Sequence, residues 1–300
     1  MATTNLANLP KNVHRMSAKL RDYYTLTKPE VNLLILMTTS AGFILGHSGS
    51  LHWFGLLNTV LGTLLVASGT ATLNQFMERQ YDAAMRRTAN RPLPAGRVSA
   101  REALWFGMGL SVAGGAYLWL SVNVLTAALA VSTLLSYLLI YTPLKRKTPL
   151  CTLLGAFPGA MPTLIGWAGS ANSLHREAWF LFAVLFLWQF PHFLAIALMY
   201  REDYDRAGYQ MLPAFDADGR FTRFEIVTFT VALIVTTLLP SWGPEHNLIY
   251  SVGVMASGAF FFYYTTRMFS GNSRQAAARV VHASVMYLPV VLALMVFCKP

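Results

Sequence analysis

Three side chains with oxygen donors recur at four-residue intervals in the first long polar segment of the chain. Asn74, Glu78 and Asp82 stand at positions i, i+4 and i+8, so on a helix they would share one face, drifting by about 80° in total. Mg²⁺ prefers such oxygens and is typically held by one or two carboxylates together with substrate phosphate. The spacing therefore indicates a magnesium site. The alternative is a solvated helix end with ion pairs to Arg79, Arg86 or Arg87.

Basic residues follow these acids and favour a phosphate ligand. Arg87 precedes the stretch Arg91-Pro-Leu-Pro-Ala-Gly96, and Arg91 begins it. The prolines and the glycine of this stretch predict a non-helical turn. Lys145 and Arg146 form a further basic cluster after Tyr141-Thr-Pro-Leu144. Arginine is suited to bidentate phosphate binding, so the combination suggests a metal–diphosphate clamp. Basic residues that only fix the membrane topology are the alternative explanation.

A second acidic segment follows an apolar run that ends in Trp188-Gln-Phe-Pro-His-Phe193. Glu202 and Asp203 would present carboxylates that could face the first set and hold a second metal on one diphosphate. His192 is an ionisable group inside the apolar run, which is a functional hypothesis by default. Its imidazole could ligate a haem iron or act as a base. A neutral histidine hydrogen-bonded to a neighbouring helix is the alternative.

The elements that position these residues are predicted to be membrane-spanning helices. Of 300 residues, 55% are hydrophobic and only 12% are charged, whereas soluble domains carry about 25% charged residues. The mean hydropathy of +0.45 agrees. The apolar runs lack the period-two alternation of a membrane barrel, and nine of them are long enough to cross a bilayer as helices. They lie near residues 30–47, 55–76, 102–120, 123–141, 150–169, 177–199, 224–241, 247–267 and 280–298.

The basic residues predict the orientation of these spans. With nine spans, 21 of the 23 lysines and arginines fall on the side of the N-terminus. The positive-inside rule makes that side cytoplasmic and puts the C-terminus on the periplasmic side. The net charge of +10 therefore reflects topology, and no nucleic-acid partner is expected. Cys151 and Cys298 would lie on opposite sides, too far apart for a disulfide. The long polar loops 77–101 and 200–223 share the cytoplasmic side.

Three stretches of this chain resemble the UbiA superfamily of membrane prenyltransferases, and within it the haem O synthases (protohaem IX farnesyltransferases). They are NQFMERQYDAAMRRTANRPLPAGRVS at 74–99, YTPLKRKTPLCTLLGAFPGAMPTLIGWAG at 141–169 and WQFPHFLAIALMYREDYDRAGYQMLP at 188–213. Glu78 stands where the superfamily usually has the middle aspartate of its first motif. Tyr200 and Tyr204 stand where its second motif usually has aspartates, which leaves Glu202 and Asp203.

The resemblance implies an all-α, nine-helix UbiA-type bundle, with residues 1–29 as a basic cytoplasmic arm and 30–300 as one membrane domain. It implies transfer of the farnesyl group of farnesyl diphosphate to a vinyl group of haem B, with addition of water, to give haem O and diphosphate. Mg²⁺ is the implied cofactor. A bacterial inner membrane fits the short N-terminal arm, and a haem A synthase or a terminal oxidase is the implied acceptor of haem O.

The residues take the following roles in this hypothesis. The predicted metal ligands and catalytic residues are Asn74, Glu78, Asp82, Glu202 and Asp203. The predicted diphosphate-binding residues are Arg87, Arg91, Lys145 and Arg146. Position and chemistry make His192 the candidate haem-binding residue. One alternative is a UbiA-type enzyme acting on a quinone precursor or a chlorophyll-like ring. Another is a transporter, because Gly155, Pro158 and Pro162 resemble a broken helix.

Overall fold

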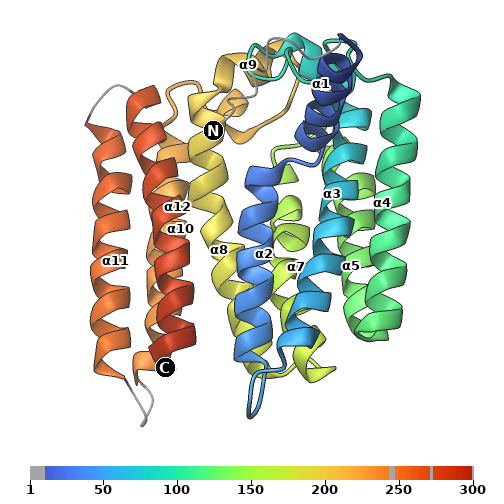
Figure 1. The fold of residues 1–300 in the computed structure, drawn as a ribbon. Helices are drawn as coiled ribbons and strands as arrows, with labels where there is room; N and C mark the ends of the chain where they lie inside the picture. Colours follow the sequence, from blue (N-terminus) through green and yellow to red (C-terminus); the bar gives the residue numbers. More distant parts are fainter. Residues whose placement is uncertain (1–10, 243–246, 271–272, 299–300) are drawn as a thin grey trace, which may run out of the picture.

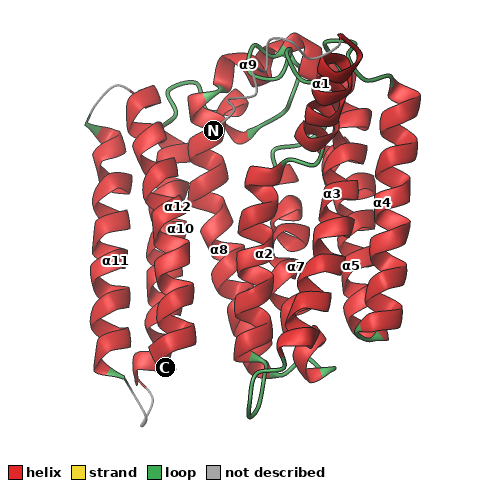
Figure 2. Ribbon diagram, in the orientation of Figure 1, coloured by secondary structure: helices red, strands yellow, loops and turns green. Residues whose placement is uncertain are grey.

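The computed structural model describes residues 11–242, 247–270 and 273–298. Within these ranges the chain is helical and contains no strand (Figure 2), which confirms the predicted all-α class. The longer helices are α1 (Lys11–Leu26), α2 (Pro29–Leu45), α3 (Trp53–Ala84), α4 (Ala100–Ser121), α5 (Val124–Ser136), α7 (Cys151–Ala171), α8 (Arg176–Met199), α10 (Arg220–Leu238), α11 (Leu248–Thr266) and α12 (Ser273–Cys298). The short ones are η2 (Tyr137–Tyr141), α6 (Thr142–Leu144), α9 (Arg201–Arg206), η3 (Leu212–Phe215), η4 (Leu239–Trp242) and η5 (Arg267–Phe269).

Eight segments of the described chain are long and apolar enough to cross a membrane. They are α3, α4, the continuous segment from α5 to α6, α7, α8, α10, α11 with η5, and α12. α2 is equally apolar but has only 17 residues, at the short end of the range for a membrane span. The predicted first span is therefore a shorter helix than expected, and the other eight are confirmed by length and composition.

α3 carries the first acidic motif beyond the predicted end of its span. The helix begins after His52, whose side chain accepts a hydrogen bond from the Gly55 amide, and it continues to Ala84. Asn74, Glu78 and Asp82 therefore lie on one uninterrupted helix, as their spacing predicted. All three are buried, so they face the protein interior at the end of a membrane helix.

A π-helical turn joins α5 to α6. Tyr137–Tyr141 adopts this wider turn, and the Thr142 hydroxyl donates to the Tyr137 carbonyl at 2.9 Å. π-turns change the helical register and are frequent at functional sites. Here the change brings the Thr142 hydroxyl onto α3, where it accepts a hydrogen bond from the Asn74 amide nitrogen at 3.1 Å. Lys145 follows one turn later.

α7 is continuous, which corrects the expectation of a broken helix at Gly155, Pro158 and Pro162. It runs unbroken from Cys151 to Ala171 with both prolines inside. The Gln189 side chain of α8 donates to the Ala156 carbonyl at 2.9 Å, and α7 packs closely against α2 and α8. The helix thus accommodates both prolines while it packs between its neighbours. The sequence feature that favoured a transporter has no counterpart in the structure.

The long polar connections gather at one end of the bundle. In Figure 1, α1, α9 and the connection between α3 and α4 lie at the top, and the C-terminal end of α12 lies at the bottom. The closest helix pairs include α3 with α4, α2 with α7, and α8 with α12. Large apolar side chains such as Leu120 (82% exposed) and Phe297 (85% exposed) point outward, as expected for a surface that contacts lipid.

Candidate functional site

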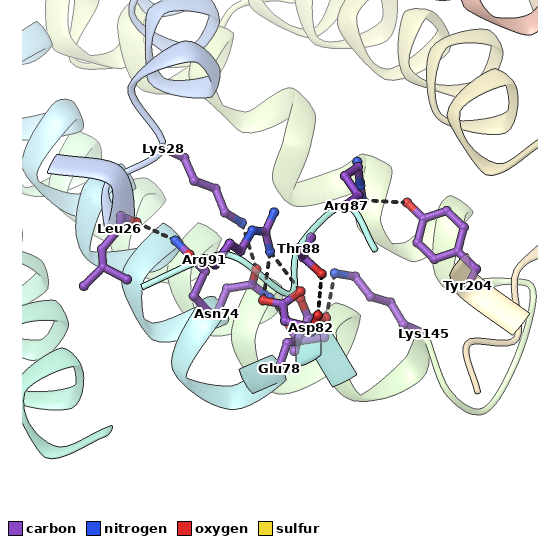
Figure 3. Close-up of polar contacts among 12 residues, drawn as sticks. Leu26, Lys28, Asn74, Glu78, Asp82, Arg87, Thr88, Arg91, Lys145 and Tyr204 are labelled. Carbon is purple, nitrogen blue, oxygen red and sulfur yellow. Dashed lines mark hydrogen bonds and ion pairs between the residues drawn. The ribbon is translucent and has the colours of Figure 1, made fainter. Parts of the chain in front are cut away.

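Asn74, Glu78 and Asp82 form a buried column of oxygen-bearing side chains on α3. Each of them accepts a hydrogen bond from a lysine or arginine side chain (Figure 3). Asn74 and Asp82 are 1% exposed and Glu78 is 6% exposed, so a solvated helix end does not describe them. Lys28 Nζ donates to Asn74 Oδ1 at 3.0 Å, and Lys145 Nζ donates to Glu78 Oε1 at 2.8 Å. Arg91 Nη1 lies 2.9 and 2.8 Å from the two carboxylate oxygens of Asp82.

The three cations reach the column from three separate parts of the chain. Lys28 stands between α1 and α2 with a left-handed backbone (φ 50°), which turns its side chain back toward α3. Lys145 follows the π-turn and α6. Arg91 lies in the turn after α3, where the Thr88 hydroxyl donates to the Asp82 carbonyl at 2.8 Å and the Arg91 amide donates to the Thr88 carbonyl at 2.9 Å. The site therefore depends on the tertiary fold, not on α3 alone.

The electrostatics of this cluster are those of a site that binds an anion. Burial, and then the nearby Arg91 guanidinium, lower the pKa of Lys28 to about 7. Burial alone would also lower the pKa of Lys145, but the Glu78 carboxylate raises it well above its usual value. Lys145 is thus held charged. A polyanion that enters the cluster would find the Lys145 ammonium and the Arg91 guanidinium already gathered and desolvated, and it would favour the charged form of Lys28.

The donor set fits Mg²⁺ held jointly by protein and substrate. Two carboxylates and one amide oxygen stand one helical turn apart on α3. In the described part of the chain, no group of three or more His, Cys, Asp or Glu residues could hold a metal. Mg²⁺ does not need such a group, because it commonly takes one or two carboxylates, substrate phosphate and water. These residues would therefore hold the ion only in company with a phosphate ligand.

The second acidic segment packs against the first, but Asp203 and Glu202 differ in their surroundings. The Asp203 carboxylate accepts hydrogen bonds from the backbone amides of Arg86 (3.2 Å) and Arg87 (3.3 Å) and from Arg206 Nη1 (3.1 Å). Asp203 thereby fastens α9 to the turn after α3. The Glu202 side chain is exposed. The second acidic segment thus contacts the turn that follows the first, through Asp203.

Arg87 and Arg146, the other two predicted diphosphate-binding residues, lie at the rim of the site and pack against tyrosine rings. The Arg87 guanidinium lies 4.6 Å from the Tyr200 ring centroid and donates to the Tyr204 hydroxyl at 3.3 Å. The Arg146 guanidinium lies 4.5 Å from the Tyr81 ring centroid and donates to its hydroxyl. Both arginines are exposed. They therefore place positive charge at the surface of the protein, beside tyrosine rings.

Two residues that the sequence analysis did not select belong to the cluster. Lys28 precedes the first predicted span, where a lysine is easily attributed to membrane topology. The adjoining Pro29 was the local sign of a turn between two helices. Tyr209 follows Gly208 in the loop after α9 and is 3% exposed. The Gln210 amide donates to the Lys145 carbonyl at 2.7 Å, so the loop that carries Tyr209 is attached to the residue that binds Glu78.

His192 lies apart from this cluster, in a network between α8 and α12. Its Nδ1 is 2.7 Å from the Ser284 hydroxyl, and its ring stacks on Trp188 with centroids 4.7 Å apart. The Ser284 hydroxyl donates its own hydrogen to the Val281 carbonyl at 2.7 Å, so it accepts from Nδ1–H. In that tautomer Nε2 keeps a lone pair. Metal-ligating histidines commonly have such a hydrogen bond on the other nitrogen.

The sequence is similar to known prenyltransferases over nearly its whole length. The model of the UbiA prenyltransferase family matches residues 35–288. A protoheme IX farnesyltransferase of Solibacter usitatus is 48% identical over 290 residues, which covers 94% of this chain and 99% of that protein. One from Koribacter versatilis is 43% identical over 290 residues, with 93% and 94% covered.

Solved structures share the fold at low sequence identity. A digeranylgeranylglyceryl phosphate synthase superposes with a TM-score of 0.75 at 17% identity, covering 94% of this chain and 98% of that one. A UbiA homologue from Archaeoglobus fulgidus, solved with GPP and Mg²⁺, superposes with a TM-score of 0.66 at 15% identity, covering 91% and 99%. At these identities the similarity establishes the architecture alone.

Proposed function

The chain belongs to the UbiA prenyltransferase family, and from this premise we propose that it transfers the farnesyl group of farnesyl diphosphate to a vinyl group of haem B. Water adds in the same reaction, and the products are haem O and diphosphate. Relatives at 48% and 43% identity are protoheme IX farnesyltransferases. The observation that carries the proposal is the buried column of Asn74, Glu78 and Asp82, in which each side chain is bound by a lysine or an arginine.

We assign Mg²⁺ to this column. The A. fulgidus homologue, solved with GPP and Mg²⁺, supports the assignment, and so does the chemistry of the three oxygen donors. When bound, the ion would stabilise the negative charge that develops on the leaving diphosphate. For the second acidic segment we propose that Asp203 mainly holds the loop, through the amides of Arg86 and Arg87. Glu202 is then the more available ligand for a second metal.

The protein's own cations would bind and orient the diphosphate. Lys145 and Arg91 lie within the cluster, and their charges would stabilise the leaving group as its bond to the allylic carbon breaks. Arg87 and Arg146 at the rim would guide the substrate inward. The farnesyl chain would extend between the apolar helices, which exclude water from the allylic cation.

His192 is the proposed contact to haem. It stands about two turns from the inner end of α8, and its Nε2 lone pair is free of the Ser284 hydrogen bond. An imidazole in that state can ligate iron or accept a proton. Exposed arginines at the loop end of the bundle could pair with the haem propionates. A haem A synthase or a terminal oxidase is the proposed recipient of haem O.

The protein is an integral membrane protein of this family. We propose a bacterial inner membrane with the N-terminus in the cytoplasm and the C-terminus in the periplasm. The support is the segregation of 21 of 23 basic residues to one side. The functional loops lie at that same end of the bundle (Figure 1), so the diphosphate site would open to the cytoplasm.

The decisive experiment is extraction and chromatography of haem from membranes that lack their own haem O synthase. The wild type should produce haem O, Asp82→Asn should produce none, and Asp218→Asn, an exposed acid in the loop before α10, should behave as the wild type. His192→Ala should insert normally and produce no haem O. Haem B alone with the wild type would reject the haem acceptor and leave a UbiA-type enzyme for a quinone precursor or a chlorophyll-like ring. Metal-independent solute flux without diphosphate release would favour a transporter.

A further inference from the structure

Tyr209 occupies a fixed position in the loop between α9 and η3. Gly208 has a positive φ of 71°, which lets the chain reverse direction there. The Tyr209 amide donates to the Tyr204 carbonyl at 2.9 Å, and the Gln210 amide donates to the Lys145 carbonyl at 2.7 Å. The backbone on both sides of the Tyr209 side chain is therefore tied down, and the side chain itself is 3% exposed.

The ring of Tyr209 is surrounded by groups of the candidate site. Its centroid lies 6.0 Å from Lys145 Nζ, 6.0 Å from the Tyr81 ring centroid and 5.8 Å from the Tyr204 ring centroid. Its hydroxyl group is close enough to Glu78 for the two to influence each other electrostatically. The residue thus belongs to the wall of the cluster formed by Lys145 and Glu78.

The hydroxyl of Tyr209 is buried beside the Glu78 carboxylate but has no hydrogen-bond partner of ordinary distance and angle among the described residues. A buried hydroxyl without a partner destabilises a protein, so such groups normally meet a side chain, a water or a ligand. The carboxylates beside it are each bound by a cationic side chain, since Lys145 binds Glu78 and Arg91 binds Asp82. A phenol is protonated at neutral pH and can therefore act as a donor.

We propose that the Tyr209 hydroxyl donates a hydrogen bond to the diphosphate group of the prenyl substrate. This assignment rests on the proposed function, because it places the diphosphate beside Lys145. A protonated phenol is a good donor to an anionic oxygen, and a hydrogen bond to a charged group is stronger than one between neutral groups. The loop after α9 would then contribute a substrate contact through Tyr209, in addition to the carboxylates of the acidic segment.

The test combines two measurements on purified Tyr209→Phe. Thermal unfolding without ligand should occur at the wild-type temperature or slightly above it, because the change removes a buried polar group that has no partner. The affinity for inorganic diphosphate in the presence of Mg²⁺ should fall by about tenfold to a hundredfold, the expected effect of losing one hydrogen bond to a charged oxygen.

Tyr250→Phe is the matched control, since the Tyr250 hydroxyl is buried far from the site and donates to the Thr237 carbonyl at 2.7 Å. It should show the opposite pair of results, with lower stability and unchanged diphosphate affinity. Equal diphosphate affinity of wild type and Tyr209→Phe would overturn the proposal, as would a wild type that does not bind inorganic diphosphate. A marked loss of stability in Tyr209→Phe would also overturn it, because it would reveal a structural partner.

The haem measurement separates this inference from the proposed function. If the wild type makes no haem O but Tyr209→Phe still weakens diphosphate binding, the haem assignment fails and the Tyr209 contact stands. If the wild type makes haem O and Tyr209→Phe binds diphosphate normally, the function stands and the Tyr209 contact is wrong.

Discussion

The pair formed by Lys145 and Glu78 illustrates what burial requires of a charged side chain. Their atoms are 2.8 Å apart, and the side chains are only 11% and 8% exposed. Taking such groups out of water costs several kcal/mol for each ion, and the attraction of the partner must offset that cost. The pair is therefore needed less for net stability than to keep each partner from being buried alone. Substrate binding can exploit this, because a diphosphate offers Lys145 a second anionic partner.

The first prediction follows from this coupling. Lys145→Met should lower the free energy of unfolding by about 3–5 kcal/mol, because it leaves the Glu78 carboxylate buried without a partner. The double variant Lys145→Met/Glu78→Gln should regain most of that loss, because no buried charge remains. Thermal unfolding in detergent measures both effects, and neither variant should produce haem O. A double variant no more stable than Lys145→Met would show that the two charges are not coupled.

The sequence predicted those residues of the site that are related by a short, regular spacing along the chain. The four-residue spacing was sufficient to place Asn74, Glu78 and Asp82 on one face. Lys28 was missed because its contact with Asn74 bridges 46 positions and depends on a left-handed turn between two helices. The hydrogen bonds from backbone amides to Asp203 could not be predicted either, since a backbone amide carries no sequence signal.

At the scale of helices, α2 and α7 approach each other so closely that side chains are excluded from the crossing. A Cβ atom added at Gly166 would lie 1.9 Å from the Thr39 carbonyl oxygen, and one added at Gly42 would lie 2.2 Å from that of Thr163. Small residues allow such close backbone contact in membranes, where van der Waals packing drives helix association. The crossing holds the first span against the centre of the bundle.

Gly166→Ala should therefore separate α2 from α7 and lower the free energy of unfolding by about 1–3 kcal/mol. Gly109→Ala is the matched control on α4, because a Cβ atom there has open space around it. That substitution should be neutral or stabilise the helix by up to about 1 kcal/mol. Both can be compared by thermal unfolding in one detergent. Equal stability of the two variants would contradict the close α2–α7 contact.

α10 depends on Asp216 for its beginning. The Asp216 carboxylate accepts hydrogen bonds from the Thr222 amide (2.7 Å) and the Thr222 hydroxyl (2.8 Å), while Gly219 before the helix offers no side chain for this purpose. Burial raises the pKa of Asp216, but the hydrogen bonds from Thr222 outweigh that effect and bring it below its usual value. The ionised form thus favours the folded protein.

The pH dependence follows with a definite sign. Because the folded-state pKa of Asp216 is below the unfolded value of about 3.9, its stabilisation is complete above that value and is lost as the pH falls through the folded-state pKa. Asp216→Asn should be less stable than the wild type by about 1–2 kcal/mol at about pH 6, with a smaller difference at about pH 3. Asp205→Asn, whose carboxylate is 51% exposed, should show no such trend. A constant difference for Asp216→Asn would exclude this mechanism.

The sequence predicted the order of the helices better than the irregular turns within them. Hydropathy located the eight described helices that are long enough to span a membrane, because exclusion of charge from lipid leaves a strong sequence signal. The π-turn at Tyr137–Tyr141 left no such signal, since it arises where α5 meets α3 and α7. Pro158 and Pro162 suggested a break in α7, but the helix is continuous and packs against α2 and α8. Local propensity is informative only where packing does not override it.

For the molecule as a whole, the chemistry and the charge asymmetry coincide at one end. The connection after α3, the helix α9 and the amphipathic α1 share that end of the bundle (Figure 1). The basic residues that set the predicted orientation are in part the same residues that line the site, such as Arg91 and Lys145. Orientation and function are therefore linked, and a test of one bears on the other.

The last prediction tests that orientation with single cysteines. Both native cysteines would first be replaced by serine, and Ser48→Cys or Asp218→Cys would be added at exposed positions in loops at opposite ends of the bundle. A membrane-impermeant maleimide should label Ser48→Cys in intact spheroplasts and Asp218→Cys only after permeabilisation, because Asp218 lies on the side of the site. The reverse pattern would place the diphosphate site on the periplasmic face and contradict the positive-inside assignment. Labelling of both without permeabilisation would mean that the spheroplasts leak, and intact ones are recognised by protection of a cytoplasmic marker protein.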